Sequence, residues 1–104
     1  MITRSTSKNT QTWYGVWYHF GDKGSFYFTT TKDSEKRFHG EGNDWVGDFT
    51  ITGYFENNSM FFEKSYPSHT IQYTGEFINK HTVTGSWEHT SSNYGKFEMT
   101  RATL

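Results

Sequence analysis

The chain has 104 residues, enough for one domain but not for two, because a single hydrophobic core usually serves about 100 to 150 residues. Its formal net charge of -1 provides no positive field that would attract a phosphate backbone, so we expect no nucleic-acid partner. Cysteine is absent, which excludes disulfides, a thiol nucleophile and a zinc site built from thiolates.

Aromatic residues supply most of the apolar surface of this sequence. Hydrophobic residues make up only 32% of the chain, but aromatic residues alone make up 20%. Each buried aromatic side chain removes roughly 150 to 250 Å² from water, so a few of them can build a core. No apolar run approaches the roughly 20 residues that span a bilayer, and the first residues are too polar for a signal peptide. We therefore expect a soluble, cytoplasmic protein without a membrane partner.

The chain divides into a polar start and a long alternating region. Residues 1–12 predict a flexible N-terminal tail, and residues 13–104 predict a single β-barrel domain. From Trp13 onward, apolar and polar residues alternate, and clusters of Gly, Asn, Asp and Ser interrupt them about every 8 to 12 residues, which is typical of a β-meander. The predicted strands cover residues 12–20, 25–31, 37–42, 48–56, 60–66, 70–77, 82–89 and 95–101.

Turn chemistry between the predicted strands favours an antiparallel, up-and-down order. Tight reversals are expected at residues 21–24, 57–58, 67–68 and 79–80, which carry Gly, Asn, Pro or Ser. Any helix is expected to be a single turn, near residues 33–36 or 44–46. Eight strands can close into a barrel that is just filled by side chains or holds one small ligand. An open sandwich is the alternative, because alternation alone is compatible with both architectures.

Every second residue of the predicted strands forms the expected interior. The inward residues are Trp13, Gly15, Trp17, Phe26, Phe28, Phe38, Gly40, Gly42, Phe49, Ile51, Gly53, Phe62, Lys64, Tyr66, Ile71, Tyr73, Gly75, Val83, Gly85, Trp87, Phe97, Met99 and Arg101. Glycine recurs at this inward parity, although it weakens an ordinary strand. In a tightly coiled barrel, glycine relieves crowding and lets strands bend, so its recurrence favours closure.

Several short motifs resemble those of the avidin and streptavidin family. Gly15-Val16-Trp17, followed by Gly24-Ser25-Phe26-Tyr27-Phe28, looks like the opening strand pair of that family. Later strands of the family are similar to Thr52-Gly53-Tyr54, Tyr73-Thr74-Gly75-Glu76-Phe77 and Ser86-Trp87.

This resemblance implies a calycin-type eight-stranded barrel and suggests equivalent site positions. It matches Ser25 with the ureido-binding serine of the family, and Tyr73 and Trp87 with two ligand-stacking tryptophans. His19 stands where the family has asparagine, and Ile71 stands where it has a hydrogen-bonding threonine. The biotin site is therefore not preserved.

A second likeness is to uncharacterised lipocalin-like domains. It is carried by Gly40-x-Gly42-x-Asp44, Phe49-x-Ile51-x-Gly53, Phe62-x-Lys64-x-Tyr66 and Gly85-x-Trp87. This likeness implies a barrel fold and no established activity.

Lys64 is the most informative polar residue, because the alternation of Phe62, Lys64 and Tyr66 directs its ammonium group inward. An unpaired buried charge costs several kcal/mol, so this group must be paired, hydrated or deprotonated. We expect Asp44 to be its partner, at an end of the barrel that orients a polar or anionic ligand head. The alternative is a structural ion pair that plugs a narrow barrel. The predicted ligand-binding residues are Trp17, Ser25, Phe28, Asp44, Phe62, Lys64, Tyr66, His69, Tyr73, Trp87 and Arg101.

The sequence favours a non-catalytic, small-molecule-binding barrel with an aromatic-lined interior. The alternative is a protein-interaction module or homo-oligomer with a filled barrel and an outer aromatic patch. The patch residues are Tyr14, Val16, Tyr18, Phe20, Tyr27, Tyr54 and Phe61, which would otherwise serve as cross-strand stabilising pairs. Interior volume separates the two functions, because a void of a few hundred Å³ favours a ligand.

No motif predicts catalysis, a metal or a cofactor. The five histidines have no local metal-binding spacing, and no pair of carboxylates is fixed by spacing. A phosphate-cradling glycine loop before a helix and a nucleophile elbow are both missing. We therefore expect a protein that is not an enzyme and needs no cofactor.

Overall fold

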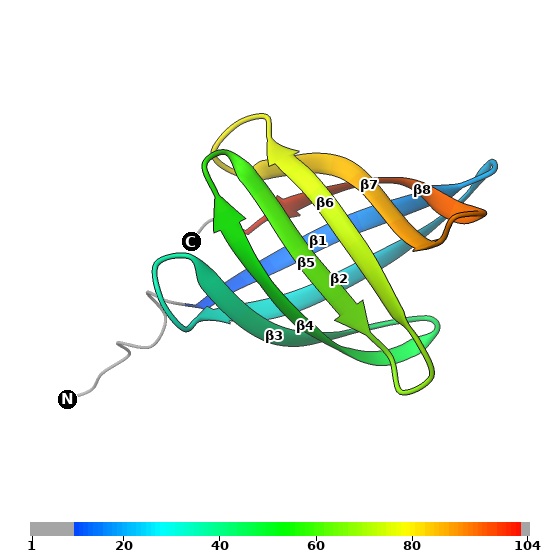
Figure 1. The fold of residues 1–104 in the computed structure, drawn as a ribbon, viewed down its shortest axis with the longest axis horizontal. Coiled ribbons are helices and arrows are strands. Elements are labelled where there is room, and N and C mark those ends of the chain that lie inside the picture. Colours follow the sequence, from blue (N-terminus) through cyan, green and yellow to red (C-terminus); the bar gives the residue numbers. More distant parts are fainter. Residues whose placement is uncertain (1–9, 103–104) are drawn as a thin grey trace.

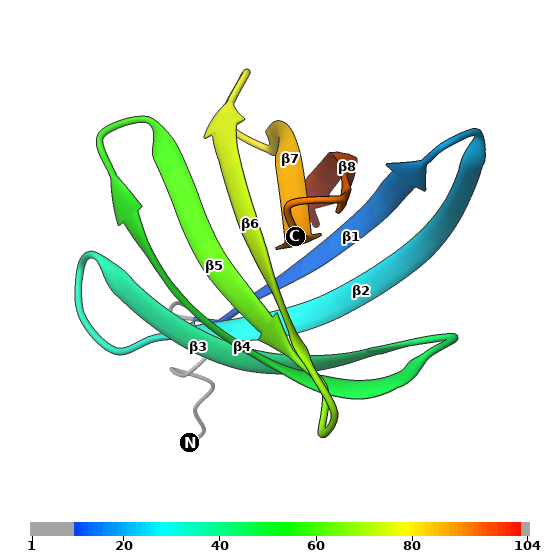
Figure 2. The same cartoon turned by 45° about the vertical axis from the view of Figure 1, so that its right-hand side comes forward.

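The computed structural model describes residues 10–102, which form eight antiparallel strands closed into one barrel (Figure 1). The strands are β1 (Thr10–His19), β2 (Asp22–Lys32), β3 (Arg37–Asp44), β4 (Gly47–Glu56), β5 (Ser59–Ser65), β6 (Thr70–Phe77), β7 (Thr82–Thr90) and β8 (Asn93–Arg101). Consecutive strands lie side by side in both ribbon views (Figure 2). Within the described residues, no helix is long or apolar enough to cross a membrane.

The first and last strands pair with each other and thereby close the barrel. Trp13 of β1 lies opposite Arg101 of β8, and Trp17 lies opposite Phe97. Each of the other strands pairs only with its two neighbours in the chain. The predicted up-and-down barrel is confirmed, and the open sandwich is excluded.

The two-residue period of the sequence places the core as predicted. Buried and more exposed residues alternate along the strands, as in β4, where Phe49 and Ile51 are buried between exposed neighbours. Strand β3 contributes one large buried side chain, Phe38. Two buried residues were missing from the predicted interior, Met60 and Thr30. Thr30 has the same parity as Phe28, and its hydroxyl accepts a hydrogen bond from the indole N–H of Trp13 at 3.2 Å. Its polar atom is thus satisfied inside the core.

Glycine permits two strands to approach closely where β6 meets β7. Gly85 lies opposite Gly75, and a Cβ atom on Gly85 would lie 2.0 Å from the carbonyl oxygen of Thr74 and 2.6 Å from the Cα atom of Gly75. Both are backbone atoms, which cannot move aside as a side chain can. This contact supports the predicted role of inward glycine in barrel closure.

Three details differ from the predictions. β1 begins at Thr10, so residues 10–12 belong to the barrel, whereas residues 1–9 of the predicted tail lie outside the described residues, as do 103–104. Residues 33–36 form bends instead of a helical turn. Residues 45–46 form the hairpin turn between β3 and β4, because Asp44 accepts backbone hydrogen bonds there.

Aromatic side chains and one arginine close one end of the barrel. The rings of Phe38 and Phe55 lie 4.8 Å apart, and Phe77 contacts both Phe55 and Trp13. The guanidinium group of Arg101 lies over the rings of Trp13 and Phe77, at 5.3 and 5.2 Å. It also donates hydrogen bonds to the carbonyl oxygen of Lys80. We call this the closed end.

Candidate functional site

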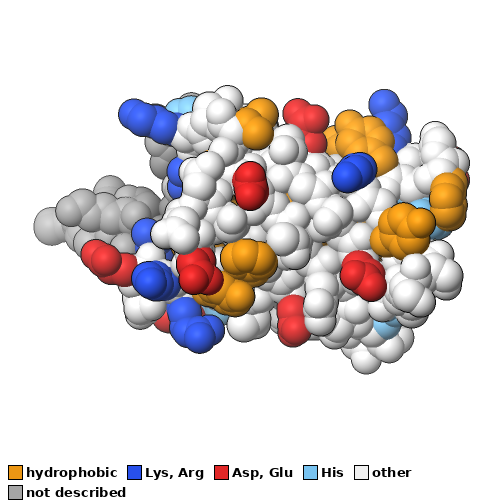
Figure 3. All heavy atoms as spheres, turned by 45° about the horizontal axis from the view of Figure 1, so that its top comes forward, with side chains coloured by type: hydrophobic (Ala, Val, Ile, Leu, Met, Phe, Trp, Pro, Cys, Tyr) orange, Lys and Arg blue, Asp and Glu red, His pale blue; other side chains and the backbone are white. Residues whose placement is uncertain are grey.

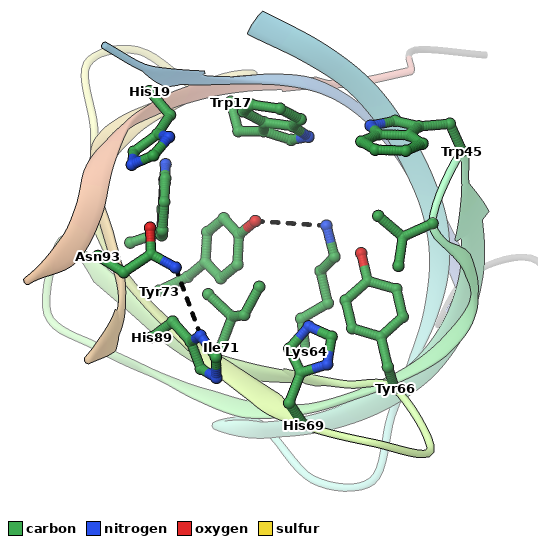
Figure 4. A pocket seen from close by; sticks show the side chains of 12 residues that line it. Trp17, His19, Trp45, Lys64, Tyr66, His69, Ile71, Tyr73, His89 and Asn93 are labelled. Atoms are coloured by element: carbon green, nitrogen blue, oxygen red, sulfur yellow. Dashed lines mark hydrogen bonds between the residues drawn. The ribbon is translucent and has the colours of Figure 1, made fainter. Parts of the chain in front are cut away.

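The opposite end of the barrel contains a cavity of about 250 Å³. We call it the open-end cavity (Figure 4). The connections at residues 20–21, 45–46, 66–69 and 91–92 lie at this end of the barrel. Its lining residues are Trp17, His19, Trp45, Val46, Lys64, Tyr66, His69, Ile71, Tyr73, Trp87, His89 and Asn93. The lumen is therefore filled over most of its length and hollow at one end, so neither of the two predicted interiors applies to the whole barrel.

A buried ion pair forms the polar floor of the cavity. Nζ of Lys64 lies 2.9 Å from Oδ2 of Asp44, and the two side chains are only 1% and 0% exposed. The hydroxyl of Tyr66 donates to the same carboxylate oxygen at 2.5 Å. Lys64 also donates to the hydroxyl of Tyr73 at 3.3 Å. The ammonium thus has both a counter-charge and a second hydrogen-bond partner.

Aromatic rings enclose the same ammonium group. Nζ of Lys64 lies 4.6 Å from the ring centroid of Phe26 and 4.8 Å from that of Phe49. The rings of Tyr66 and Tyr73 are both 5.5 Å away. Rings at such distances attract a cation by their quadrupoles, which offsets part of the cost of removing it from water.

Asp44 connects this floor to the mouth of the cavity. Its Oδ1 accepts hydrogen bonds from the backbone N–H groups of Val46, at 3.0 Å, and Gly47, at 3.3 Å. Aspartate commonly stabilises a turn in this way. The turn places Trp45, whose side chain is 77% exposed, at the edge of the cavity. One carboxylate therefore neutralises Lys64 and holds the turn that carries Trp45.

Burial changes the proton affinities of the floor residues. It lowers the pKa of Lys64, and the hydrogen bond and charge of Asp44 offset only part of this effect. Burial and the hydrogen bond to Asp44 raise the pKa of Tyr66 well above its usual value. Burial and the nearby charge of Asp44 raise the pKa of Tyr73 in the same direction. Both tyrosines therefore remain protonated hydroxyl groups at neutral pH.

The raised pKa of Tyr73 predicts a loss of stability at alkaline pH. Above about pH 10, the unfolded chain loses the phenolic proton of this residue while the folded chain keeps it. The free energy of unfolding should therefore fall, with Tyr73 contributing up to about 1.4 kcal/mol per pH unit. Lys64 contributes a slope of the opposite sign up to about pH 11, because its lowered pKa lets the unfolded chain keep this proton longer than the folded chain, and it contributes none once it is neutral in both states.

Urea unfolding between pH 9 and 12 measures this slope. A Tyr73→Phe variant should show a shallower decrease than the parent chain, since it has no phenolic proton at this position. Equal slopes for the two proteins would contradict the raised pKa.

Two tryptophans form walls of the cavity because glycines face them across the sheet. Trp17 lies opposite Gly24, and Trp87 lies opposite Gly95. A Cβ atom on Gly24 would lie 2.4 Å from the Trp17 indole, and one on Gly95 would lie 2.7 Å from Nε1 of Trp87. Each indole therefore lies flat over a glycine, which leaves the centre of the cavity open.

Three histidines lie around the mouth. The His69 ring stacks on Tyr66 at 4.8 Å and lies 5.0 Å from the His89 ring. The His19 ring contacts Trp87 at 5.4 Å. Among residues 10–102, Nε2 of His19 is a buried side-chain atom without a hydrogen-bond partner. Buried polar atoms without partners are uncommon in folded proteins, and this one belongs to a residue that lines the open-end cavity.

The structure brings together most of the predicted ligand-binding residues. Six of them line the open-end cavity: Trp17, Lys64, Tyr66, His69, Tyr73 and Trp87. Asp44 contacts two of these six from beneath the cavity wall.

Four predicted residues do not reach the cavity. Ser25 is exposed on the outer face, where it lies opposite Val16. Phe28 is fully buried in the filled part of the lumen, and Phe62 lies beneath Tyr73 with parallel rings 4.7 Å apart. Arg101 belongs to the closed end, about 13 Å from the level of Trp17 along β1.

Several lining residues were not predicted. Trp45 and Val46 occupy a two-residue turn, where strand alternation gives no information. A signal was present in the sequence, because two apolar residues stand in a turn, where polar residues are usual, and this could have indicated a role in binding. His89 and Asn93 flank the turn between β7 and β8, and a 3.5 Å hydrogen bond connects their side chains.

Four of the outer aromatic residues form two separate cross-strand pairs. Tyr14 stacks on Tyr27 across β1 and β2, and Tyr54 stacks on Phe61 across β4 and β5. Strand β3 lies between these pairs and presents His39, among other polar side chains, to the outside. Figure 3 shows one face of the molecule, on which apolar side chains lie in separate groups among charged ones. This arrangement fits cross-strand stabilisation.

Metal binding has no geometric support in the described chain. Within residues 10–102, no three His, Asp or Glu side chains are close enough to hold a metal ion.

The protein is thus a closed, eight-stranded, up-and-down barrel with an aromatic-rich interior. A redesigned beta barrel has a TM-score of 0.68 and 13% identity to it, and the match covers 99% of this chain and 98% of that chain. A second redesigned beta barrel, mFAP1 bound to DFHBI, has a TM-score of 0.66 and 14% identity, with coverages of 96% and 100%. No family model and no curated protein matches the sequence. At these identities, the likeness shows the fold alone.

Proposed function

We propose that this barrel binds a small, planar, partly apolar molecule in the open-end cavity and does not transform it catalytically. The observation that carries the proposal is the combination of aromatic walls, from Trp17, Trp45 and Trp87, with a buried polar floor at Lys64. Ligand sites commonly combine an apolar lining with a few polar groups that fix orientation. The mFAP1 barrel, which shares the fold, was solved bound to DFHBI and supports this use of the architecture.

The volume of the cavity limits the size of the ligand. An apolar protein cavity of about 150 Å³ is enough for benzene. The 250 Å³ cavity of this barrel therefore suits a molecule of one or two rings. Larger ligands would have to extend through the mouth, past Trp45.

The floor favours a ligand with a hydrogen-bond acceptor. Lys64 uses two of its three N–H donors, for Asp44 and Tyr73. The Tyr73 hydroxyl accepts from Lys64, and its own proton has no acceptor among the described residues. A carbonyl, carboxylate or phenolate oxygen would fit between these two donors, and the mouth histidines would contact its far side.

We further propose that the chain is a calycin-type barrel related to lipocalin-like domains. The motif likeness and the closed barrel support this relation. Ser25, which the resemblance to avidin matches with a ureido-binding serine, is exposed on the outer face. The proposed ligand is therefore not biotin.

Trp45→Ala tests the proposed site at low risk to the fold. The side chain is largely exposed, so the free energy of unfolding should change by no more than about 0.5 kcal/mol. Loss of one aromatic wall should weaken ligand binding about tenfold. The probes are planar aromatic carboxylates and their uncharged counterparts, and the readout is quenching of tryptophan fluorescence.

Tyr14→Ala is the matched control, because it removes an exposed ring from the outer face. Binding should be unchanged in this variant. Native mass spectrometry of protein from its own cells would identify a natural ligand and the number of subunits. Equal affinities for the parent chain and Trp45→Ala would place the binding site elsewhere.

A further inference from the structure

Lys64 differs from every other described lysine in its surroundings. The other lysines are exposed: Lys23, Lys32, Lys36, Lys80 and Lys96. Lys64 is buried, yet its Nζ points toward the centre of the open-end cavity, with the Tyr73 hydroxyl beside it (Figure 4). A primary amine is thus held among aromatic rings at the bottom of a hollow that is open at its mouth.

Such an amine is suited to attack a carbonyl carbon. The nucleophile is the neutral amine, and a lysine in an apolar pocket is neutral more often than one in water. The lowered pKa of Lys64 agrees with this geometry. The cavity also holds a proton relay, since the Tyr73 hydroxyl accepts from Nζ and keeps its own proton for a hydrogen bond to the carbonyl oxygen.

We propose that Lys64 captures a small aromatic aldehyde as a reversible imine in the open-end cavity. The inference rests on the proposed ligand site and adds a covalent step to it. The ring would lie between the tryptophans, and the aldehyde oxygen would take the acceptor position between Lys64 and Tyr73.

The step balances without an oxidant or reductant. The Lys64 ammonium first releases one proton to solvent at the mouth of the cavity. The lone pair of the neutral Nζ then forms a C–N bond, and the carbonyl π electrons move to oxygen, which takes the proton of Tyr73. Tyr73 regains a proton from Nζ, which gives a neutral carbinolamine. The C–O bond then breaks, the nitrogen lone pair completes a C=N bond, and a second proton passes from nitrogen through Tyr73 to the departing oxygen. One amine and one aldehyde give one imine and one water.

Asp44 would stabilise the protonated form of this product. Its Oδ2 atom lies 2.9 Å from Nζ, so a protonated imine nitrogen would keep the counter-charge that the ammonium has now. The carboxylate has a positioning role and exchanges no proton in the step.

The test uses the full chain and two compounds of nearly equal shape. The protein is mixed with 2-naphthaldehyde, any imine is fixed with sodium cyanoborohydride, and the modified lysines are identified by peptide mass mapping. Lys64 should be labelled about tenfold faster than each of the five exposed lysines. An excess of 2-naphthylmethanol, which cannot form an imine, should slow labelling of Lys64 and leave the exposed lysines unaffected.

Tyr73→Phe serves as a second variant that keeps the amine. Loss of the proton relay should slow labelling of Lys64 about a hundredfold, with no change at the exposed lysines. Labelling of Lys64 at the parent rate in this variant would overturn the proton route. An unlabelled Lys64 in the parent chain would overturn the capture itself.

Tryptophan quenching by 2-naphthylmethanol separates this inference from the proposed function. Quenching without labelling of Lys64 would leave the ligand site in place and reject only the imine. Absence of both would reject the ligand site for this compound class together with the imine.

Discussion

Asp44→Asn is expected to lower the free energy of unfolding by about 3 to 5 kcal/mol at neutral pH. Asparagine keeps the oxygen that accepts from Val46 and Gly47, so the turn at residues 45–46 should remain. The variant loses the negative charge beside Lys64, whose side chain is 1% exposed. Lys64 must then stay charged without a counter-ion or release its proton, and release at pH 7 costs at most about 5 kcal/mol.

Lys64→Met in the Asp44→Asn background should recover most of this loss. A methionine fills similar space without a charge, and an apolar replacement for a buried ion pair is often neutral or stabilising. The measurement is urea unfolding of the two single variants and the double variant, from which the coupling energy follows.

Lys96→Met controls for the removal of a lysine, because Lys96 is exposed on the outer face. It should change the free energy of unfolding by no more than about 0.5 kcal/mol. If Asp44→Asn were as stable as this control, water would have to solvate Lys64 and Asp44 at the floor of the cavity. The ion pair would then not be buried.

Gly85→Ala is expected to cost about 3 kcal/mol, the upper part of the range for overpacking. The added methyl group would lie 2.0 Å from the carbonyl oxygen of Thr74, so β6 and β7 would have to separate. Separation would weaken the ladder between these two neighbouring strands and with it the closure of the barrel.

Thermal and urea unfolding would measure this cost, with Thr84→Ala as the neighbouring control. Thr84 has the opposite parity along β7, so its loss should have a small effect. A Gly85→Ala protein as stable as the control would show that the inward glycines are not needed for the approach of the strands.

The barrel could be predicted from the sequence because its main signal is local. Alternation with a period of two assigned Phe26, Phe28 and Lys64 to the interior, and the structure places all three there. The pairing of Lys64 with Asp44 followed from the cost of an uncompensated buried charge. These predictions needed only the parity of residues within a strand.

The candidate site was predicted less completely. Alternation along a strand shows whether a side chain faces inward, but not how far along the barrel axis it lies. Phe28, Phe62 and Arg101 all face inward, but two lie in the filled lumen and the third lies at the closed end. Position along the axis depends on the register between strands, which a single sequence does not reveal. Ser25 is a different case, since its odd number in β2 already conflicted with the inward parity of Phe26.

The stacked guanidinium of Arg101 has a consequence for exchange kinetics. Because aromatic side chains fill the lumen below the open-end cavity and Arg101 stacks over the rings at the closed end, the cavity has its entrance at one end of the barrel. Solvent displaced by an incoming molecule must leave through the same portal that admits the molecule. Residence time therefore depends on the few side chains around that portal, and substitutions there should change arrival and departure rates together.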